Sequence, residues 1–156
     1  MVLTFGAIEL GIGFSQKGAL ESAARSGARK ASTATSELEP TFALDVVNAV
    51  NAALDSSAVP QLVELDVYKD GVGIDPSVSC TSQCLKFLPD TINVHHFSTT
   101  YSGAWLDTQR FGCGSNPDKV TVRVVGQFRF LSGLIGKGAV TLIATTTLAF
   151  EPTNCP

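Results

Sequence analysis

Residues 16–32 read QKGALESAARSGARKAS, a stretch whose small side chains are spaced for one face of a helix. They recur at three- and four-residue intervals, which is the period of an α-helix. A stripe of small residues lets a helix approach its neighbour closely. We therefore expect residues 1–32 to form one continuous helix. The side chains expected to pack against a sheet or a second helix are Leu20, Ala24, Gly27 and Ala31.

Towards the N-terminus, the first 14 residues contain one charged side chain, Glu9. As a helix they would span about 21 Å, less than the ~30 Å hydrocarbon core of a bilayer. They lack the basic start and the small-residue cleavage site of a secretory signal peptide. We therefore expect these residues to be the end of a longer membrane helix, with Glu9 among its packing residues. The alternative is a buried helix in an ordinary cytosolic domain.

A second helix is expected after the polar segment 32–39. Pro40 suits its first turn, and Pro60 lies beyond its end. Apolar side chains at helical spacing give this helix one buried face. They are Phe42, Val46, Val50, Ala53 and Leu54.

From residue 60 onwards the hydrophobic period changes to two, which predicts strands. Between Val63 and Val67, apolar residues alternate with Glu64 and Asp66, so these two acids are expected on a polar face. A polar loop is expected over 98–117, and a hairpin connection over 132–138. The expected strands are 63–67, 85–88, 92–97, 120–130 and 139–150. Two helices followed by four or five antiparallel strands make an α+β domain, with both helices packed on the sheet.

The composition argues against several classes of function. The net charge is −3 and only 16% of the residues are charged, whereas nucleic-acid binding needs clustered Lys and Arg. His95 and His96 are adjacent, so on a strand their rings would lie on opposite faces and could not share a metal. Residues 133–138, GLIGKG, lack the spacing of a phosphate-binding loop, and no nucleophile motif is present. We expect no catalytic residue, no cofactor and no metal; a small hydrolase is the weakest alternative.

Four cysteines lie in the C-terminal half, at positions 80, 84, 113 and 155. They are expected to form disulfides, because zinc ligands usually come in two tight clusters and only Cys80 and Cys84 are close in sequence. Four cysteines allow three pairings. If 119–130 and 139–150 form an antiparallel hairpin, Cys113 and Cys155 flank adjacent strand ends. We therefore expect Cys113–Cys155, which leaves Cys80–Cys84.

Two parts of the chain resemble one family. Residues 5–11, FGAIELG, and the stretch 16–32 with its AARSGAR segment resemble the end of the membrane helix of TadE-like proteins and the amphipathic turn that follows it. These proteins are pseudopilins of tight-adherence (Flp-type) pili. Residues 63–71, VELDVYKDG, the cysteines, Trp105, and the final AFEP at 149–152 resemble an actinobacterial-type variant. Family members carry a processing region before this point, so the resemblance implies that the chain begins inside the helix.

The resemblance implies a pilin-like fold and a non-enzymatic minor pilin or pseudopilin that contributes to pilus assembly and adhesion. Residues 1–32 would be the anchoring and packing helix, and 33–156 an extracytoplasmic head with disulfides. The implied partners are other pilin subunits, the pilus assembly machinery and the cytoplasmic membrane, with no nucleic acid. The implied location is the cell envelope and its surface. The alternative is a secreted or surface-anchored binding domain without a pilus role.

Overall fold

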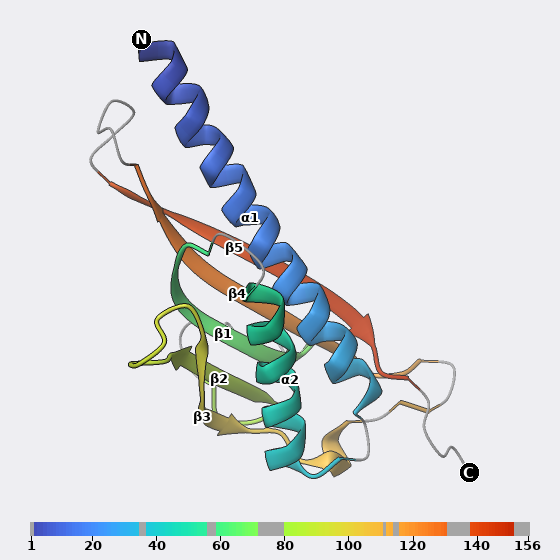
Figure 1. The fold of residues 1–156 in the computed structure, drawn as a ribbon. Helices are drawn as coiled ribbons and strands as arrows, with labels where there is room; N and C mark the ends of the chain where they lie inside the picture. The colour runs from blue at the N-terminus through green and yellow to red at the C-terminus, as the bar shows by residue number, and fades with distance from the viewer. Residues whose placement is uncertain are drawn as a thin grey trace.

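Two helices cover one face of a five-stranded antiparallel sheet (Figure 1). This is the arrangement in the computed structural model, which describes residues 2–34, 37–55, 59–71, 80–110, 112–113, 116–130 and 138–151. The architecture confirms the predicted α+β class, with a long N-terminal helix and a second helix on an antiparallel sheet.

The first helix, α1 (Val2–Thr33), is continuous. Its N-terminal end extends beyond the rest of the molecule in Figure 1, and its C-terminal half lies across the sheet. From Ala19 onwards its inner face is buried, because side chains no larger than leucine recur on that face. α1 runs alongside the last strand of the sheet, and the Glu151 N–H donates a hydrogen bond of 2.8 Å to the Ser32 carbonyl at its end.

The second helix, α2 (Glu39–Leu54), has Pro40 in its first turn, as predicted. Figure 1 shows it running back along α1 in the opposite direction. Its apolar face enters the core between α1 and the sheet. The buried side chains are Phe42, Ala43, Val46, Val47, Val50 and Leu54.

A buried arginine ties the connection between the helices to the sheet. The Arg110 Nη1 donates to the Ala34 carbonyl at 2.9 Å, and Nη2 donates to the carbonyl of Glu37. The guanidinium lies 4.1 Å from the centroid of the Phe42 ring. Burial lowers the pKa of Arg110. The charge is thus compensated by helix-end carbonyls and an aromatic face rather than by a close carboxylate.

The strands are β1 (Gln61–Lys69), β2 (Cys84–Pro89), β3 (Phe97–Ala104), β4 (Lys119–Arg129) and β5 (Ala139–Ala149). Their order in the sheet is β3-β2-β1-β4-β5, so β3 and β5 are the edge strands. β4 and β5 pair antiparallel over their full length, from Lys119 opposite Ala149 to Arg129 opposite Ala139. The predicted connection at 132–138 lies outside the described residues, apart from its last residue.

The strand predicted at 92–97 is wrong, and so is the loop predicted over all of 98–117. Residues 92–96 form a turn and β3 begins at Phe97. The Asp90 carboxylate accepts the N–H groups of Ile92 and Asn93, at 2.7 and 3.2 Å. Such local side-chain bonds compete with strand pairing, which a propensity argument does not detect.

Candidate assembly surface

The N-terminal half of α1 presents apolar side chains to solvent. Ile8, Leu10 and Phe14 are all exposed, and Phe14 keeps 75% of its surface accessible. Leu10 and Phe14, four residues apart, lie on one face of the helix and form an apolar patch, whereas Ile8 lies on the opposite side. This part of α1 therefore presents apolar side chains to solvent on two sides.

A groove follows this patch, where α1 crosses the β4–β5 pair. Its volume is about 280 Å³. Phe128 and Phe130, which line the groove from the sheet side, meet edge to face with their ring centroids 5.1 Å apart. The missing side chain of Gly13 leaves space in the groove, since a Cβ at this position would be in van der Waals contact with the Phe128 ring, at 3.6 Å. The lining residues are Glu9, Leu10, Gly13, Phe14, Lys17, Phe128, Phe130, Val140 and Leu142.

The charged side chains of the groove lie at its two ends along α1. Glu9 is only 3% exposed, although the helix around it projects from the molecule. Lys17, two turns further on, forms an i, i+4 pair with Glu21 at 3.6 Å and donates to the Ile143 carbonyl of β5. The groove is therefore an apolar surface with an acid at one end and a base at the other.

The four small or apolar positions predicted for packing lie further along α1. Leu20, Ala24 and Ala31 are fully buried in the core. A Cβ on Gly27 would lie 2.6 Å from Val50 Cγ2 of α2 and 3.2 Å from Val122 Cγ1 of β4. The structure thus brings these four residues together against α2 and the sheet, whereas Glu9 lies apart from them in the groove.

Comparison with known proteins gives one match, and it covers this helix. Residues 1–29 match the family model described as TadE-like protein. The N-terminal helix is TadE-like. The match confirms the resemblance of the N-terminal stretch to TadE-like proteins and suggests an association with tight-adherence pili and the cell envelope. The resemblance of residues 63–152 to an actinobacterial-type variant stays a prediction. No curated protein and no solved structure matches the chain.

The sequence led us to expect that residues 1–14 are the end of a membrane helix. In the described part of the chain, no helix combines the length and the hydropathy of a membrane-spanning segment.

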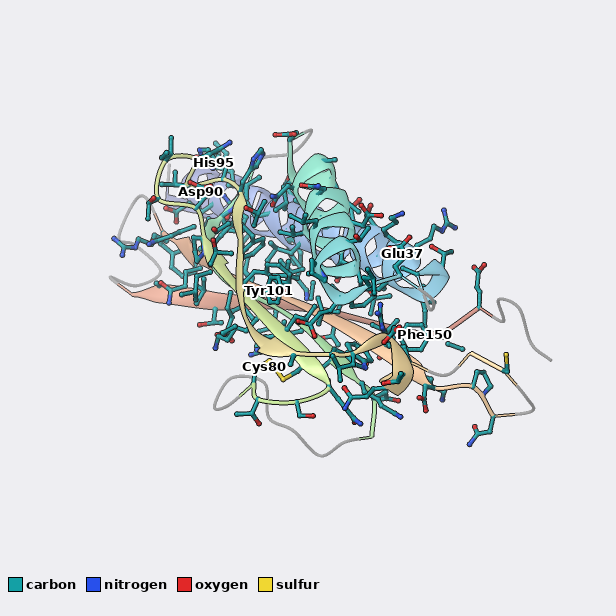
Figure 2. The ribbon with its side chains drawn as sticks, turned by 90° about the horizontal axis from the view of Figure 1, so that it is seen from below. Glu37, Cys80, Asp90, His95, Tyr101 and Phe150 are labelled. Carbon is teal, nitrogen blue, oxygen red and sulfur yellow. A yellow bond between two sulfur atoms is a disulfide. The ribbon has the colours of Figure 1, made fainter. Side chains whose placement is uncertain are left out.

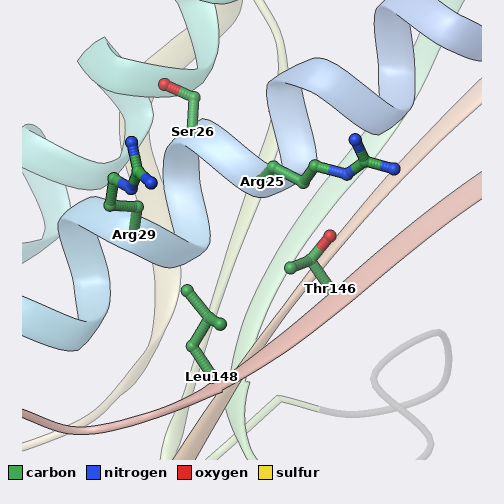
Figure 3. Close-up of a pocket in the computed structure, with 5 residues that line it drawn as sticks. All are labelled: Arg25, Ser26, Arg29, Thr146 and Leu148. Carbon is green, nitrogen blue, oxygen red and sulfur yellow. The ribbon is translucent and has the colours of Figure 1, made fainter.

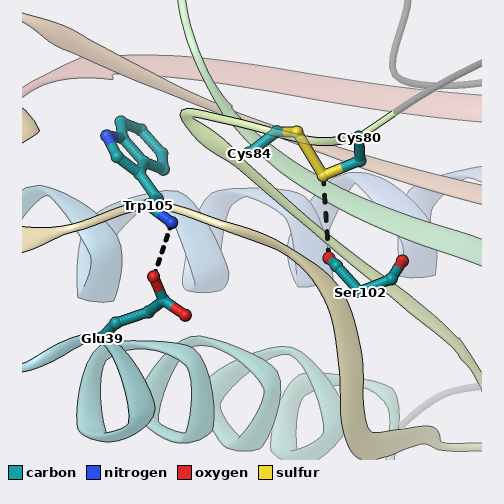
Figure 4. Close-up of a disulfide and its surroundings, with 5 residues drawn as sticks. All are labelled: Glu39, Cys80, Cys84, Ser102 and Trp105. Atoms are coloured by element: carbon teal, nitrogen blue, oxygen red, sulfur yellow. Dashed lines mark hydrogen bonds between the residues drawn. A yellow bond between two sulfur atoms is a disulfide. The ribbon is translucent and has the colours of Figure 1, made fainter.

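A disulfide between Cys80 and Cys84 joins the start of β2 to the segment before it, as predicted (Figure 4). The Cα atoms are 5.6 Å apart. Gly103 on the neighbouring β3 has a φ of 97°, and any Cβ there would collide with Cys80 Sγ and the Cys84 carbonyl. Glycine is thus required beside the disulfide, for its conformation and for its size.

The second predicted disulfide stays a prediction. Cys113 is disulfide-bonded. Cys155 lies outside the described residues, so the pairing Cys113–Cys155 is not tested.

The face of the sheet away from the helices carries a cluster of four charges that the sequence did not predict. Asp66 is fully buried, and its Oδ2 lies 2.7 Å from Arg123 Nη1. Glu64 accepts from the same nitrogen at 2.7 Å and from Lys86 at 2.7 Å. Burial opposes ionisation of Glu64, yet these two cations lower its pKa. Burial, and then the charge of Glu64, raise the pKa of Asp66 to about 6.

The two histidines have different surroundings in the structure. Both lie in the turn before β3, close to Asp90 at one end of the molecule, and Figure 2 shows His95 there, far from Phe150. His95 is exposed, and His96 contacts the Asp55 carboxylate at 2.6 Å. Among the described residues, no group of three or more potential ligands is placed to hold a metal.

The groove itself was missed from the sequence. Phe128 and Phe130 belong to the strand predicted at 120–130; Phe128 lies in β4 and Phe130 directly follows its last residue, Arg129. Their meeting with Leu10 and Phe14 depends on where α1 crosses the β4–β5 pair. The alternation of apolar residues predicts which side chains share one face of a strand. It does not predict which helix will cover that face, so the sequence contains only a weak signal for this groove.

Proposed function

We propose that this protein is a non-enzymatic minor pilin or pseudopilin of a tight-adherence pilus. In this proposal the first half of α1 packs into the membrane and against other pilin subunits or the assembly machinery. The observation that carries the proposal is the exposure of Ile8, Leu10 and Phe14, on two sides of a TadE-like helix whose second half buries its inner face in the core.

Energetics supports an apolar partner for these three side chains. Burying one large apolar side chain contributes about 1.5–3 kcal/mol. Three such side chains and the adjoining groove give an apolar environment several kcal/mol to gain from contact with this end of α1. The second half of α1 is already buried, so contact there would compete with the fold.

The remainder of the chain, 33–156, is proposed to be an extracytoplasmic head that contributes to assembly and adhesion. The Cys80–Cys84 disulfide supports this location, because structural disulfides persist in oxidising compartments. In the described part of the head, the acids and bases of the cluster around Asp66 pair with each other, as structural ion pairs do.

The proposal is tested by site-specific photo-crosslinking of the protein in its own cells. A photoreactive phenylalanine analogue at Phe14 should give cross-links to pilin subunits or to lipid. The same analogue at Ile92, which is more exposed than Phe14 but located on the head, is the matched control and should give neither. Membrane fractionation completes the test: Phe14→Glu should shift the protein towards the soluble fraction, and Ile92→Glu should not.

Two results would contradict the proposal. One is a soluble protein that cross-links to nothing through Phe14 in cells that assemble the pilus. The other is normal pilus assembly by the Phe14→Glu variant.

A further inference from the structure

The edge strand β5 lacks, in its sequence and in its register, the features that usually prevent strands from pairing with other proteins. Its sequence, AVTLIATTTLA, contains no charge, no proline and no glycine. It also pairs with β4 in one unbroken register, without a bulge. Natural edge strands are commonly protected by lysine, proline or a bulge. A long, regular and uncharged edge therefore offers a template for strand addition.

The other edge is protected. The pairing of β2 with β3 is interrupted between Phe87 and Pro89. Both the N–H and the carbonyl of Phe97, the first residue of β3, are hydrogen-bonded to the Asn51 side chain of α2, each at 2.9 Å. The two edges of one sheet thus differ in how open they are.

The backbone groups that remain available on β5 can be located. The Phe150 N–H donates to the Asp118 carbonyl, so residues 118 and 150 form a hydrogen-bonded pair. In an antiparallel ladder these pairs alternate, so even-numbered residues of β5 bond to β4 and odd-numbered ones point outwards. Lys17 already donates to the outward carbonyl of Ile143. Beyond the other end of β5, the outward N–H of Glu151 donates to the Ser32 carbonyl of α1. The open part of the edge therefore lies between these two contacts with α1, from Thr145 through Thr147.

A basic pocket lies beside this open part (Figure 3). Arg25, Ser26 and Arg29 line it from α1, and Thr146 and Leu148 line it from β5. Its volume is about 570 Å³. Figure 3 shows the Arg25 side chain extending along α1 on the side of Thr146, whereas the Arg29 guanidinium points away from Leu148, towards Ser26.

The charge in the pocket is largely uncompensated. The Arg25 side chain is 74% exposed, and its ion pair with Glu21 is long, at 3.8 Å. The ion pairs of the described residues include none from Arg29. The pocket is thus suited to a carboxylate, which arginine binds through charge-assisted hydrogen bonds.

We propose that β5, from Thr145 to Ala149, pairs with an extended segment of another protein that carries Asp or Glu at alternate positions. In a strand added at this edge, alternate side chains project towards α1, next to Thr146 and Leu148. An acidic side chain there reaches the pocket between Arg25 and Arg29. Main-chain bonds supply affinity and the carboxylate supplies specificity. β5 contains no acid, so a second copy of this strand would leave the arginines without a partner.

The probes are two fluorescein-labelled synthetic peptides, one of alternating threonine and glutamate and one of alternating threonine and lysine. Binding to the full chain is followed by fluorescence anisotropy, and the amide signals of Thr145 and Thr147 are followed by ¹⁵N NMR. We expect the glutamate peptide to bind at least tenfold more tightly than the lysine peptide. We also expect the two amides to shift on binding.

Variants separate the two parts of the site. Thr145→Pro removes an outward N–H that β4 does not use, and it should abolish binding. Thr141→Pro makes the same change at the other end of the edge, beyond the carbonyl that Lys17 covers, and should preserve binding. The double variant Arg25→Gln/Arg29→Gln should remove the preference for glutamate over lysine.

Three results would overturn the inference: no binding of the glutamate peptide, equal affinity for both peptides, or full binding by the Thr145→Pro variant. Amide shifts that depend on protein concentration without peptide would identify a second copy as the occupant and would also overturn it. The inference does not depend on the proposed pilus role, since these measurements concern β5 and its pocket alone.

Discussion

Replacing Gly27 by alanine should destabilise the protein, although alanine is the better helix former. In an open helical position this change is worth about 1 kcal/mol of stabilisation. At Gly27 the new Cβ would lie 2.6 Å from Val50 Cγ2 and 3.2 Å from Val122 Cγ1. Valine in a helix has essentially one side-chain rotamer, so Val50 cannot turn away. Forcing a methyl group into a packed core costs about 1–3 kcal/mol.

The expected net effect is a loss of up to about 2 kcal/mol in the free energy of unfolding, since overpacking exceeds the gain in helix propensity. Urea denaturation followed by circular dichroism measures this loss. Gly18 is the matched control, because it lies in the same helix and a Cβ there meets nothing within 4 Å. Gly18→Ala should therefore stabilise the protein by about 1 kcal/mol.

A double-mutant cycle locates the clash. Val50→Ala removes the methyl group that the new Cβ would strike, so adding Gly27→Ala to this variant should stabilise it. The reasoning is refuted if Gly27→Ala is as stable as Gly18→Ala. It is equally refuted if the two substitutions at Gly27 and Val50 are simply additive.

Three further predictions concern the cluster around Asp66 and the cysteines. Burial raises the pKa of Asp66 from 3.8 to about 6, so the folded protein holds this proton more tightly than the unfolded chain does. The resulting stabilisation is fully present below about pH 4 and is lost as the pH rises through 6. Denaturation from pH 4 to 7 should show this loss, up to ~3 kcal/mol, in the native protein and not in Asp66→Asn. Changing both Cys80 and Cys84 to serine should lower the free energy of unfolding by no more than about 2 kcal/mol, because the closed loop is short, and urea denaturation of the double variant measures this loss. Mass mapping of a non-reduced digest should yield a peptide that links Cys113 to Cys155, and a link from either residue to Cys80 or Cys84 would contradict the predicted pairing.

The sequence predicted most of the fold because its patterns are local. Helical spacing identified α1 and the buried face of α2, and clean alternation identified β4. The failure before β3 came from Asp90, whose carboxylate binds two backbone N–H groups and ends the extended pattern. Asp66 was expected on a polar face, and that face is indeed polar, but Arg123 and its neighbours bury the acid.

The candidate sites were harder to predict than the fold, because they depend on contacts between distant segments. The TadE-like motif indicated which helix carries the assembly surface. It could not indicate that Phe128 would face Phe14, or that the arginines of α1 would adjoin the open part of β5. These neighbours follow from strand order and from the line along which α1 crosses the sheet, and neither is written in a local pattern.

The continuity of α1 also determines how the molecule would respond to a mechanical load. A pull on its projecting end travels along an unbroken helix axis that lies beside β5. Leu20 packs over Gly126 and Gly27 receives Val50, so sliding α1 lengthwise would require these side chains to pass their neighbours together. Such a load acts in shear over the whole contact rather than peeling it open from one end. The force needed to pull α1 out of the head should therefore grow with the length of helix that is buried. The second half of α1 is thus the part that resists the force.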